Sequence, residues 1–300
     1  MRARFDELLR RAEEIFAAGD IHAAIDLAVE AEKLAAGDGG TDLADHAFCN
    51  RCAFLIELDR GHEQIPKLKQ ILLRSGDAMN RWRAAYYTSV AYDHDNELDK
   101  ASSYAQRARE LAAVCAEPAP LAASANLVAT LALRSSEFET AEETYREAAE
   151  HYRNLDGYHR IMAAQVKDNL GYVLMCLDRL ADGLVLCEEA RDALETLDAN
   201  HYLHQTLQDL CYGYLLAEQL ERAKVCGERA LDLAVDADDA LVVKNSLFLL
   251  SEIAVRRGDT FGARRYLHDL TAYYPEAGVS EEIIDVFLAT DLTTVVNLRG

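Results

Sequence analysis

Two cysteines one helical turn apart, Cys49 and Cys52, are the first residues in the sequence whose spacing suits chemistry. A pair of thiolates at this spacing supplies half of a common zinc site, which takes four ligands in all. The sequence offers no second pair with matching spacing. The pattern therefore predicts two small residues packed inside a helix, and we expect no metal site.

Two other short patterns suggest cation binding and fail for a similar reason. Residues 93–97 begin like a calcium loop, but an EF-hand needs Gly at its sixth position and Glu at its twelfth, where this chain has Leu98 and Tyr104. His201 and His204 lie one helical turn apart with no acid or cysteine in the pattern. We expect a solvated turn at 93–97 and a surface pair of histidines.

The usual signatures of catalysis are missing from the sequence. It contains no Gly-rich phosphate loop, no G-x-S-x-G elbow and no H-E-x-x-H motif. An enzyme needs a cleft where titratable groups converge, and no such group of residues stands out. The chain is therefore predicted not to be an enzyme, with no catalytic residue and no cofactor.

Composition excludes several other classes of protein. The chain has 300 residues, with 31 Lys and Arg against 52 Asp and Glu, which gives a net charge of −21. Such acidity repels phosphate backbones, so no nucleic-acid partner is expected. No stretch reaches the roughly 20 apolar residues of a membrane span. With only 15 Gly and 4 Pro, and 50% hydrophobic residues, neither a β-sandwich nor a disordered chain is favoured.

The cysteines indicate the redox compartment. Their number is odd, and the start of the chain lacks the apolar run of a secretory signal. We therefore expect free thiols in a reduced, cytoplasmic protein. The seven residues are Cys49, Cys52, Cys115, Cys176, Cys187, Cys211 and Cys226.

A pattern of small residues repeats about every 40 positions. One position of the pattern holds Ala24, Ile65, Ala101, Ala141, Gly183, Ala223 and Ala263. The position twelve residues earlier holds Ala12, Ala53, Ser89, Ala129, Gly171, Cys211 and Ser251, all of them small. Apolar residues at helical spacing lie between these positions, which predicts two antiparallel helices per repeat that cross where the small residues meet. One pair cannot bury its apolar face alone, so the pairs are expected to stack as a solenoid.

This pattern resembles the tetratricopeptide repeat (TPR) family, in its subgroup with a period near 40 residues. The resemblance implies an all-α, right-handed α-solenoid of about seven helix-turn-helix repeats over residues 1–275. The repeats are placed near 5–40, 46–78, 82–117, 122–157, 159–198, 201–238 and 239–275. Residues 276–300 are predicted to form a capping helix that begins after Ser280 and a short tail. The tail either packs on the end of the last repeat, which we favour, or docks as a strand.

The same resemblance places a binding groove on the concave face, where the first helix of each repeat contributes side chains. Asn and Gln can pair with the backbone of an extended peptide, and Tyr adds flat apolar area with a polar tip. The predicted peptide- or protein-binding residues are Asn50, Arg51, Phe54, Arg83, Tyr86, Tyr87, Asn126, Thr130, Gln165, Asp168, Asn169, Tyr172, Gln205, Gln208, Asp209 and Tyr212, with Asn245 and Glu252 in the last repeat.

These features predict a non-enzymatic adaptor that binds a peptide or protein segment in this groove. The alternative is a peptide-sensing regulator that changes the pitch of its solenoid. We expect a monomer or weak homodimer with no membrane partner. Basic groove residues in repeats 2 to 4 and acidic ones in repeats 5 and 6 predict that the N-terminal half favours the acidic end of a bound segment.

Overall fold

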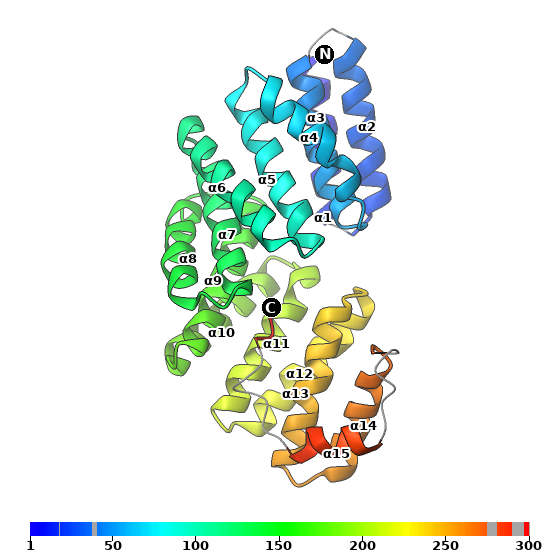
Figure 1. Cartoon of the computed structure of the whole chain (residues 1–300), viewed down its shortest axis with the longest axis vertical. Helices are drawn as coiled ribbons and strands as arrows, with labels where there is room; N and C mark the ends of the chain where they lie inside the picture. Colours follow the sequence, from blue (N-terminus) through cyan, green and yellow to red (C-terminus); the bar gives the residue numbers. More distant parts are fainter. Residues whose placement is uncertain (18, 38–40, 275–280, 290–296, 300) are drawn as a thin grey trace. The chain divides into compact units, whose positions relative to one another are not determined.

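The described part of the chain is entirely helical. The structure is a computed structural model, and it describes residues 1–17, 19–37, 41–274, 281–289 and 297–299. These residues form fifteen α-helices and one short 3-10 helix, with no strand among them (Figure 1). The all-α fold predicted from the sequence is confirmed.

Fourteen of the helices alternate as the first and second members of seven pairs. The first helices are α1 (Arg2–Ala17), α3 (Thr41–Ile56), α5 (Ala78–His94), α7 (Pro118–Arg134), α9 (His159–Cys176), α11 (Asn200–Leu216) and α13 (Ala240–Arg256). The second helices are α2 (Ile21–Gly37), α4 (Ile65–Arg74), α6 (Leu98–Cys115), α8 (Phe138–Tyr152), α10 (Leu180–Thr196), α12 (Leu220–Asp236) and α14 (Thr260–Thr271). The 3-10 helix η1 (His62–Gln64) precedes α4, and α15 (Glu281–Ala289) follows the last pair.

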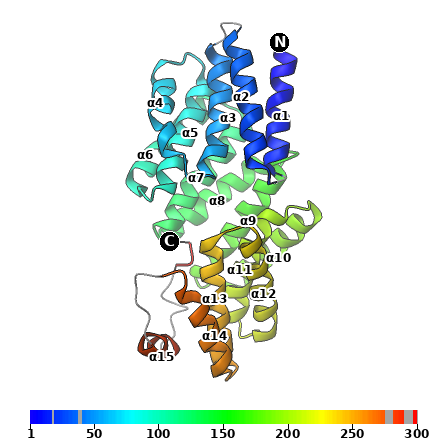
Figure 2. The ribbon, with the colours of Figure 1, turned by 90° about the vertical axis from the view of Figure 1, so that its right-hand side faces the viewer.

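The chain divides into two compact units. The N-terminal unit is Met1–Leu131 with Glu150–Tyr152, and the C-terminal unit is Ala132–Ala149 with Arg153–Gly300. Within the N-terminal unit α1, α3 and α5 contact one another in order, and α1, α2 and α3 stand side by side (Figure 2). Within the C-terminal unit α9, α11 and α13 form a similar row, with α10 and α12 packed against it. Each row therefore consists of first helices, as a helical-repeat fold requires.

The small residues lie where the two helices of a pair cross. In α5 the Ser89 hydroxyl donates a 2.7 Å hydrogen bond to the carbonyl oxygen of Ala101 in α6, and both residues are fully buried. A Cβ atom on Gly171 would lie 2.5 Å from the Cys187 sulfur and 2.8 Å from the Gly183 carbonyl oxygen. The backbones of α9 and α10 thus approach too closely for any side chain at this point, which confirms the predicted role of the small positions.

Turns between paired helices use the left-handed backbone region. Gly19 and Gly258 take it with φ of 92° and 75°, whereas Asn96 and Asp178 take it at 58° and 59°. Asn and Asp tolerate this region better than most residues do. The Asp239 carboxylate caps α13 by accepting hydrogen bonds from the backbone N–H groups of Leu241 and Val242, as expected for a capping acid between repeats.

Helix α15 forms as predicted and contacts α14. The Arg264 guanidinium pairs with Glu281 at 2.9 Å and also with Asp285, and Ile284 is only 5% exposed. The expected cap, Ser280, lies outside the described residues. No helix in the described part of the chain is long and apolar enough to cross a membrane.

Candidate functional site

The C-terminal residues of the chain lie against the first helices of the C-terminal unit. The guanidinium of Arg299 is held between Asp168 on α9, at 3.4 Å, and Asp209 on α11. The three side chains are 7%, 4% and 0% exposed, so this ion pair is removed from water. Figure 1 shows the end of the chain beside α11. Asp168 and Asp209 are both predicted groove residues, whereas the basic partner from the tail was not predicted.

The backbone of the tail is bound as well as its side chain. The Leu298 amide donates a 2.9 Å hydrogen bond to the Tyr172 hydroxyl, and the Asn245 side-chain amide donates one of 2.8 Å to the Leu298 carbonyl oxygen. Leu298 itself is 3% exposed. One residue of the tail therefore has both its backbone polar groups satisfied by side chains from α9 and α13.

Asn297 fixes the start of the docked segment. Its side-chain amide donates to the Leu133 carbonyl oxygen at 3.0 Å and to the Ser136 hydroxyl at 3.1 Å. Its side-chain oxygen accepts from the Arg299 amide at 3.0 Å, which folds the segment into a local turn. We name Leu133, Ser136, Asp168, Tyr172, Asp209 and Asn245 the tail site; all six belong to the C-terminal unit.

Burial and charge act in opposite directions in the tail site. Burial raises the pKa of Asp209 to about 7 and also raises the pKa of Asp168, while the attraction of Arg299 counteracts both shifts. Burial also disfavours the charge on Arg299, but the two carboxylates outweigh it and hold its pKa above the usual value. The guanidinium therefore stays charged, and it keeps its two acidic neighbours closer to ionisation.

Two other predicted groove residues of the C-terminal unit contact members of the tail site. The Tyr212 ring lies 5.8 Å from the Tyr172 ring, centroid to centroid, and the Gln208 amide donates to Asp209 at 3.4 Å. Gln165, Asn169 and Gln205 are half-buried. Their role in binding stays a prediction.

The predicted groove residues of the N-terminal unit fall into different environments. Arg51 pairs with Glu32 of α2 at 3.0 Å, and Phe54 is 3% exposed and packs on Phe16. Both therefore belong to the packing between helices, because their side chains are already engaged there. Arg83 is half-buried and donates to Asn80 at 3.2 Å.

The remaining members of that predicted set are polar and partly exposed. The Asn50 amide donates to Glu13 at 3.4 Å, and Tyr86 and Tyr87 stack edge to face with their centroids 5.3 Å apart. Asn126 and Thr130 on α7 are half-buried. None of these contacts involves a ligand-like segment, so their binding role also stays a prediction.

Asn297, Leu298 and Arg299 are not among the predicted binding residues. We favoured packing on the end of the last repeat, whereas residues 297–299 instead contact α9, α11 and α13. Residues 292–296 of the predicted tail lie outside the described residues. The one available signal was complementary charge, because the groove positions of repeats 5 and 6 carry two acids and no base.

The residues considered for chemistry have mostly structural environments. Cys49 and Cys52 are fully buried, and burial raises the pKa of the Cys49 thiol to about 12. This confirms the predicted packing role. The expectation of a surface pair at His201 and His204 is wrong for His204, which is 6% exposed and bonds to Asp239 at 3.0 Å. The side chain of His201 is not among those described.

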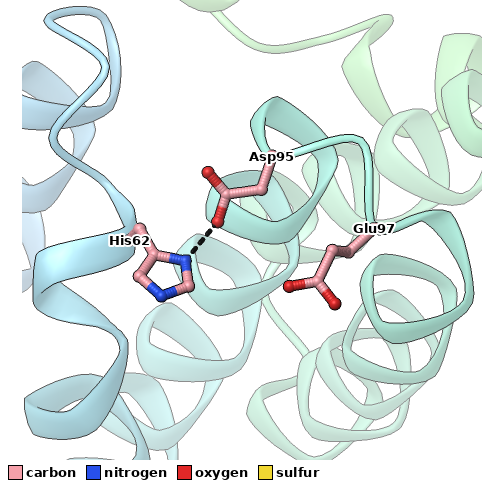
Figure 3. Close-up of side chains that lie close together, drawn as sticks. All are labelled: His62, Asp95 and Glu97. Carbon is pink, nitrogen blue, oxygen red and sulfur yellow. Dashed lines mark hydrogen bonds and ion pairs between the residues drawn. The ribbon is translucent and has the colours of Figure 1, made fainter.

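A further cluster lies on the surface of the N-terminal unit. His62, Asp95 and Glu97 turn their side chains toward one another, with potential ligand atoms within 4.8 Å (Figure 3). Asp95 accepts from the His62 ring at 2.5 Å, and Glu97 pairs with Lys100. These contacts account for all three side chains without an ion, and Asp95 and Glu97 lie in the solvated turn predicted for residues 93–97.

Comparison with known proteins identifies the fold. No protein-family model matches the sequence, and no curated protein matches it as a relative. A solved tetratricopeptide repeat protein from Parabacteroides merdae aligns with 98% of this chain and 100% of its own, at 12% identity and a TM-score of 0.52. The chain has the tetratricopeptide-repeat fold.

Two further structures share this TPR-like fold over nearly the whole chain. A Rap protein complexed with Competence and Sporulation Factor gives a TM-score of 0.72 at 12% identity, over 98% of this chain and 85% of that one. The apo form of the quorum sensor NprR from B. thuringiensis gives 0.62 at 12% identity, over 96% and 79%. At this identity the likeness describes the fold alone.

Proposed function

We propose that the chain is a non-enzymatic adaptor that holds a short segment of a partner protein at the tail site. The observation that carries the proposal is the docking of residues 297–299. The site binds the backbone N–H and C=O groups of Leu298 through Tyr172 and Asn245. Such contacts are available to any segment that takes the same turn, because every residue other than proline offers the same two groups.

The groups near the tail site favour binding over catalysis. The two carboxylates that would be candidates for acid and base are both engaged by Arg299. Burial raises the pKa of the nearby Cys176 thiol to about 11, and that of Cys187 also lies well above the usual value. Neither thiol is then ionised at neutral pH, as a nucleophile would need to be.

Affinity capture with mass spectrometry tests the adaptor proposal. The variant combines Tyr172→Phe with Asn245→Ala, which removes two hydrogen-bonding groups and leaves the acidic residues in place. Its matched control combines Tyr273→Phe with Asn154→Ala, two exposed positions of the same unit. We expect specific partners to be retained by wild type and the control and lost by the variant. Equal retention by all three proteins would refute binding at this site.

A second candidate is a regulator that senses a peptide. The likeness to the Rap protein complexed with Competence and Sporulation Factor and to the quorum sensor NprR favours it, because both cover almost all of this chain. In this mechanism an incoming peptide takes the place of residues 297–299 and changes how the helices pack. Small-angle scattering with and without candidate peptides tests it, and unchanged curves at saturating peptide would exclude it.

We further propose that the protein works as a monomer or weak dimer in the cytoplasm. All seven cysteines are unpaired, which fits a reducing compartment. Sedimentation would establish the oligomeric state, and localisation of a tagged full chain would test the compartment.

A further inference from the structure

The two carboxylates of the tail site need a positive group beside them. Asp168 and Asp209 are almost fully buried on neighbouring helices. Buried carboxylates are strongly disfavoured unless a cation pairs with them. Among the described residues the only cation within ion-pair distance of either one is Arg299. The two acids therefore require one positive group beside them, and Arg299 of the same chain provides it.

We propose that Asp168 and Asp209 form a recognition site for the arginine of a protein segment that takes the same local turn as residues 297–299 and in which an apolar residue directly precedes that arginine. Asn297, Leu298 and Arg299 are the chain's own occupant of this site, and a partner segment binds by displacing them. The inference rests on the proposed adaptor function and adds to it the chemical class of the ligand.

The geometry favours arginine over lysine as the bound cation. The two carboxylates come from different helices, and a guanidinium spreads several N–H donors in one plane, whereas an ammonium is a compact point charge. The Arg299 guanidinium also lies 5.5 Å from the centroid of the Tyr172 ring. A planar cation near an aromatic ring gains further stabilisation when it is removed from water.

The residues before the arginine add a second level of selectivity. Leu298 is 3% exposed, so the position before arginine is enclosed and takes an apolar side chain. Asn297 uses its amide to bind Leu133 and Ser136 and uses its side-chain oxygen to accept from the Arg299 amide. A small polar residue that can form this turn is therefore preferred two positions before the arginine.

Occupation by the chain's own end makes binding competitive. A segment tethered to its own binding site acts at an effective concentration that a free segment must exceed. A partner segment of the same sequence must overcome that concentration, so its apparent affinity is lowered by the fraction of sites already filled. Removing the tail's arginine should open the site to a segment supplied in trans.

Fluorescence anisotropy with a labelled peptide tests the inference. The peptide has the sequence of residues 293–300, and the proteins are full-length wild type and full-length Arg299→Ala. We expect the Arg299→Ala chain to bind at least about tenfold more tightly than wild type, because the tethered competitor is weakened. A peptide with alanine in place of its arginine should bind at least about tenfold more weakly, and one with lysine should fall between them.

Two further variants of the protein test the role of the buried acids and supply a matched control. Adding Asp209→Asn to the Arg299→Ala chain should reduce binding of the arginine peptide about tenfold. Adding Asp192→Asn, an acid that is 67% exposed and pairs with its neighbour Arg191, should leave binding unchanged. Because the altered peptides leave the protein untouched, arginine dependence is measured even where a protein variant folds poorly.

Four results would overturn the inference. They are equal binding of the arginine and alanine peptides, an unchanged affinity with Asp209→Asn, and equal binding by wild type and Arg299→Ala. The fourth is a wild-type dimer in sedimentation that is lost in Arg299→Ala, since it would place the tail in the site of a second copy. If partners are still lost with Tyr172→Phe and Asn245→Ala while the arginine tests fail, the adaptor function stands without the arginine specificity.

Discussion

Burial disfavours the charge on two arginines, one in each unit, but their pKa values shift in opposite directions. Burial lowers the pKa of the half-buried Arg83 in the N-terminal unit. In the C-terminal unit two carboxylates outweigh the same effect, so the pKa of Arg299 is raised. Among the described residues Arg83 has no ion-pair partner, and its guanidinium donates to the neutral Asn80. The difference shows that the two buried acids, rather than burial itself, decide the direction in which the pKa of the arginine shifts.

The largest expected effect comes from removing the counter-charge in the C-terminal unit. Arg299→Ala leaves Asp168 and Asp209 as two buried acids with no counter-charge. Loss of one partner from a buried ion pair typically lowers the free energy of unfolding by about 3 kcal/mol. We expect a loss of roughly that size, measured by hydrogen exchange at the amides of α9 and α11. Arg222→Ala, which removes an exposed ion pair with Glu188, is the control and should have little effect.

A double change should recover part of that loss. In the Arg299→Ala chain, Asp209→Asn removes one of two buried acids that lack a counter-charge while keeping a side chain of nearly the same size. The free energy of unfolding should then rise by about 1–2 kcal/mol relative to Arg299→Ala alone, although Asp209→Asn in wild type lowers it. Urea unfolding of the four proteins measures this coupling. A further loss in the double variant would contradict a primarily electrostatic role.

The acidity of the tail site predicts a pH dependence of binding. Burial raises the pKa of Asp209, the attraction of Arg299 lowers it and repulsion from Asp168 raises it, so that the pKa is about 7 in the occupied site. An empty site lacks the attraction and so holds its proton up to higher pH. Binding must release that proton, so affinity falls as the pH drops toward 7.

The labelled peptide should therefore bind the Arg299→Ala chain about threefold or more weakly at pH 6.5 than at pH 8.5. Asp209→Asn in the same chain is the control, and it should flatten the profile. Tighter binding at pH 6.5 than at pH 8.5 would contradict the release of a proton on binding.

The smallest expected effect is in the N-terminal unit. Arg83→Met keeps most of the side-chain length and removes a charge that has one hydrogen bond to a neutral group. We expect the free energy of unfolding to change by less than about 1 kcal/mol, because the lost bond is offset by relief of the desolvated charge. Thermal unfolding measures it. A loss as large as that of Arg299→Ala would mean that Arg83 has a buried acidic partner after all.

Local features of the fold could be predicted from residue types and their spacing. The small residues at Ser89 and Gly171 indicated where paired helices cross, because only small residues permit the backbones to approach. Asp168, Tyr172 and Asp209 could be placed on one face from helical periodicity together with the TPR resemblance.

Other features depended on contacts between residues far apart in the chain. Phe54 was expected in the groove but packs on Phe16, and His204 was expected at the surface but is buried against Asp239. Helical periodicity places a residue on a face of its own helix. It does not say which neighbouring helix covers that face, so such assignments fail where packing decides.

Residue spacings shorter than one repeat predict the paired helices, their crossing points, the turns and the acidic character of the predicted C-terminal groove. The position of residues 297–299 against α9, α11 and α13 follows from long-range packing instead. The contact between Arg299 and Asp168 joins residues 131 positions apart. The contact depends on burial, because two carboxylates that are removed from water require a cation beside them.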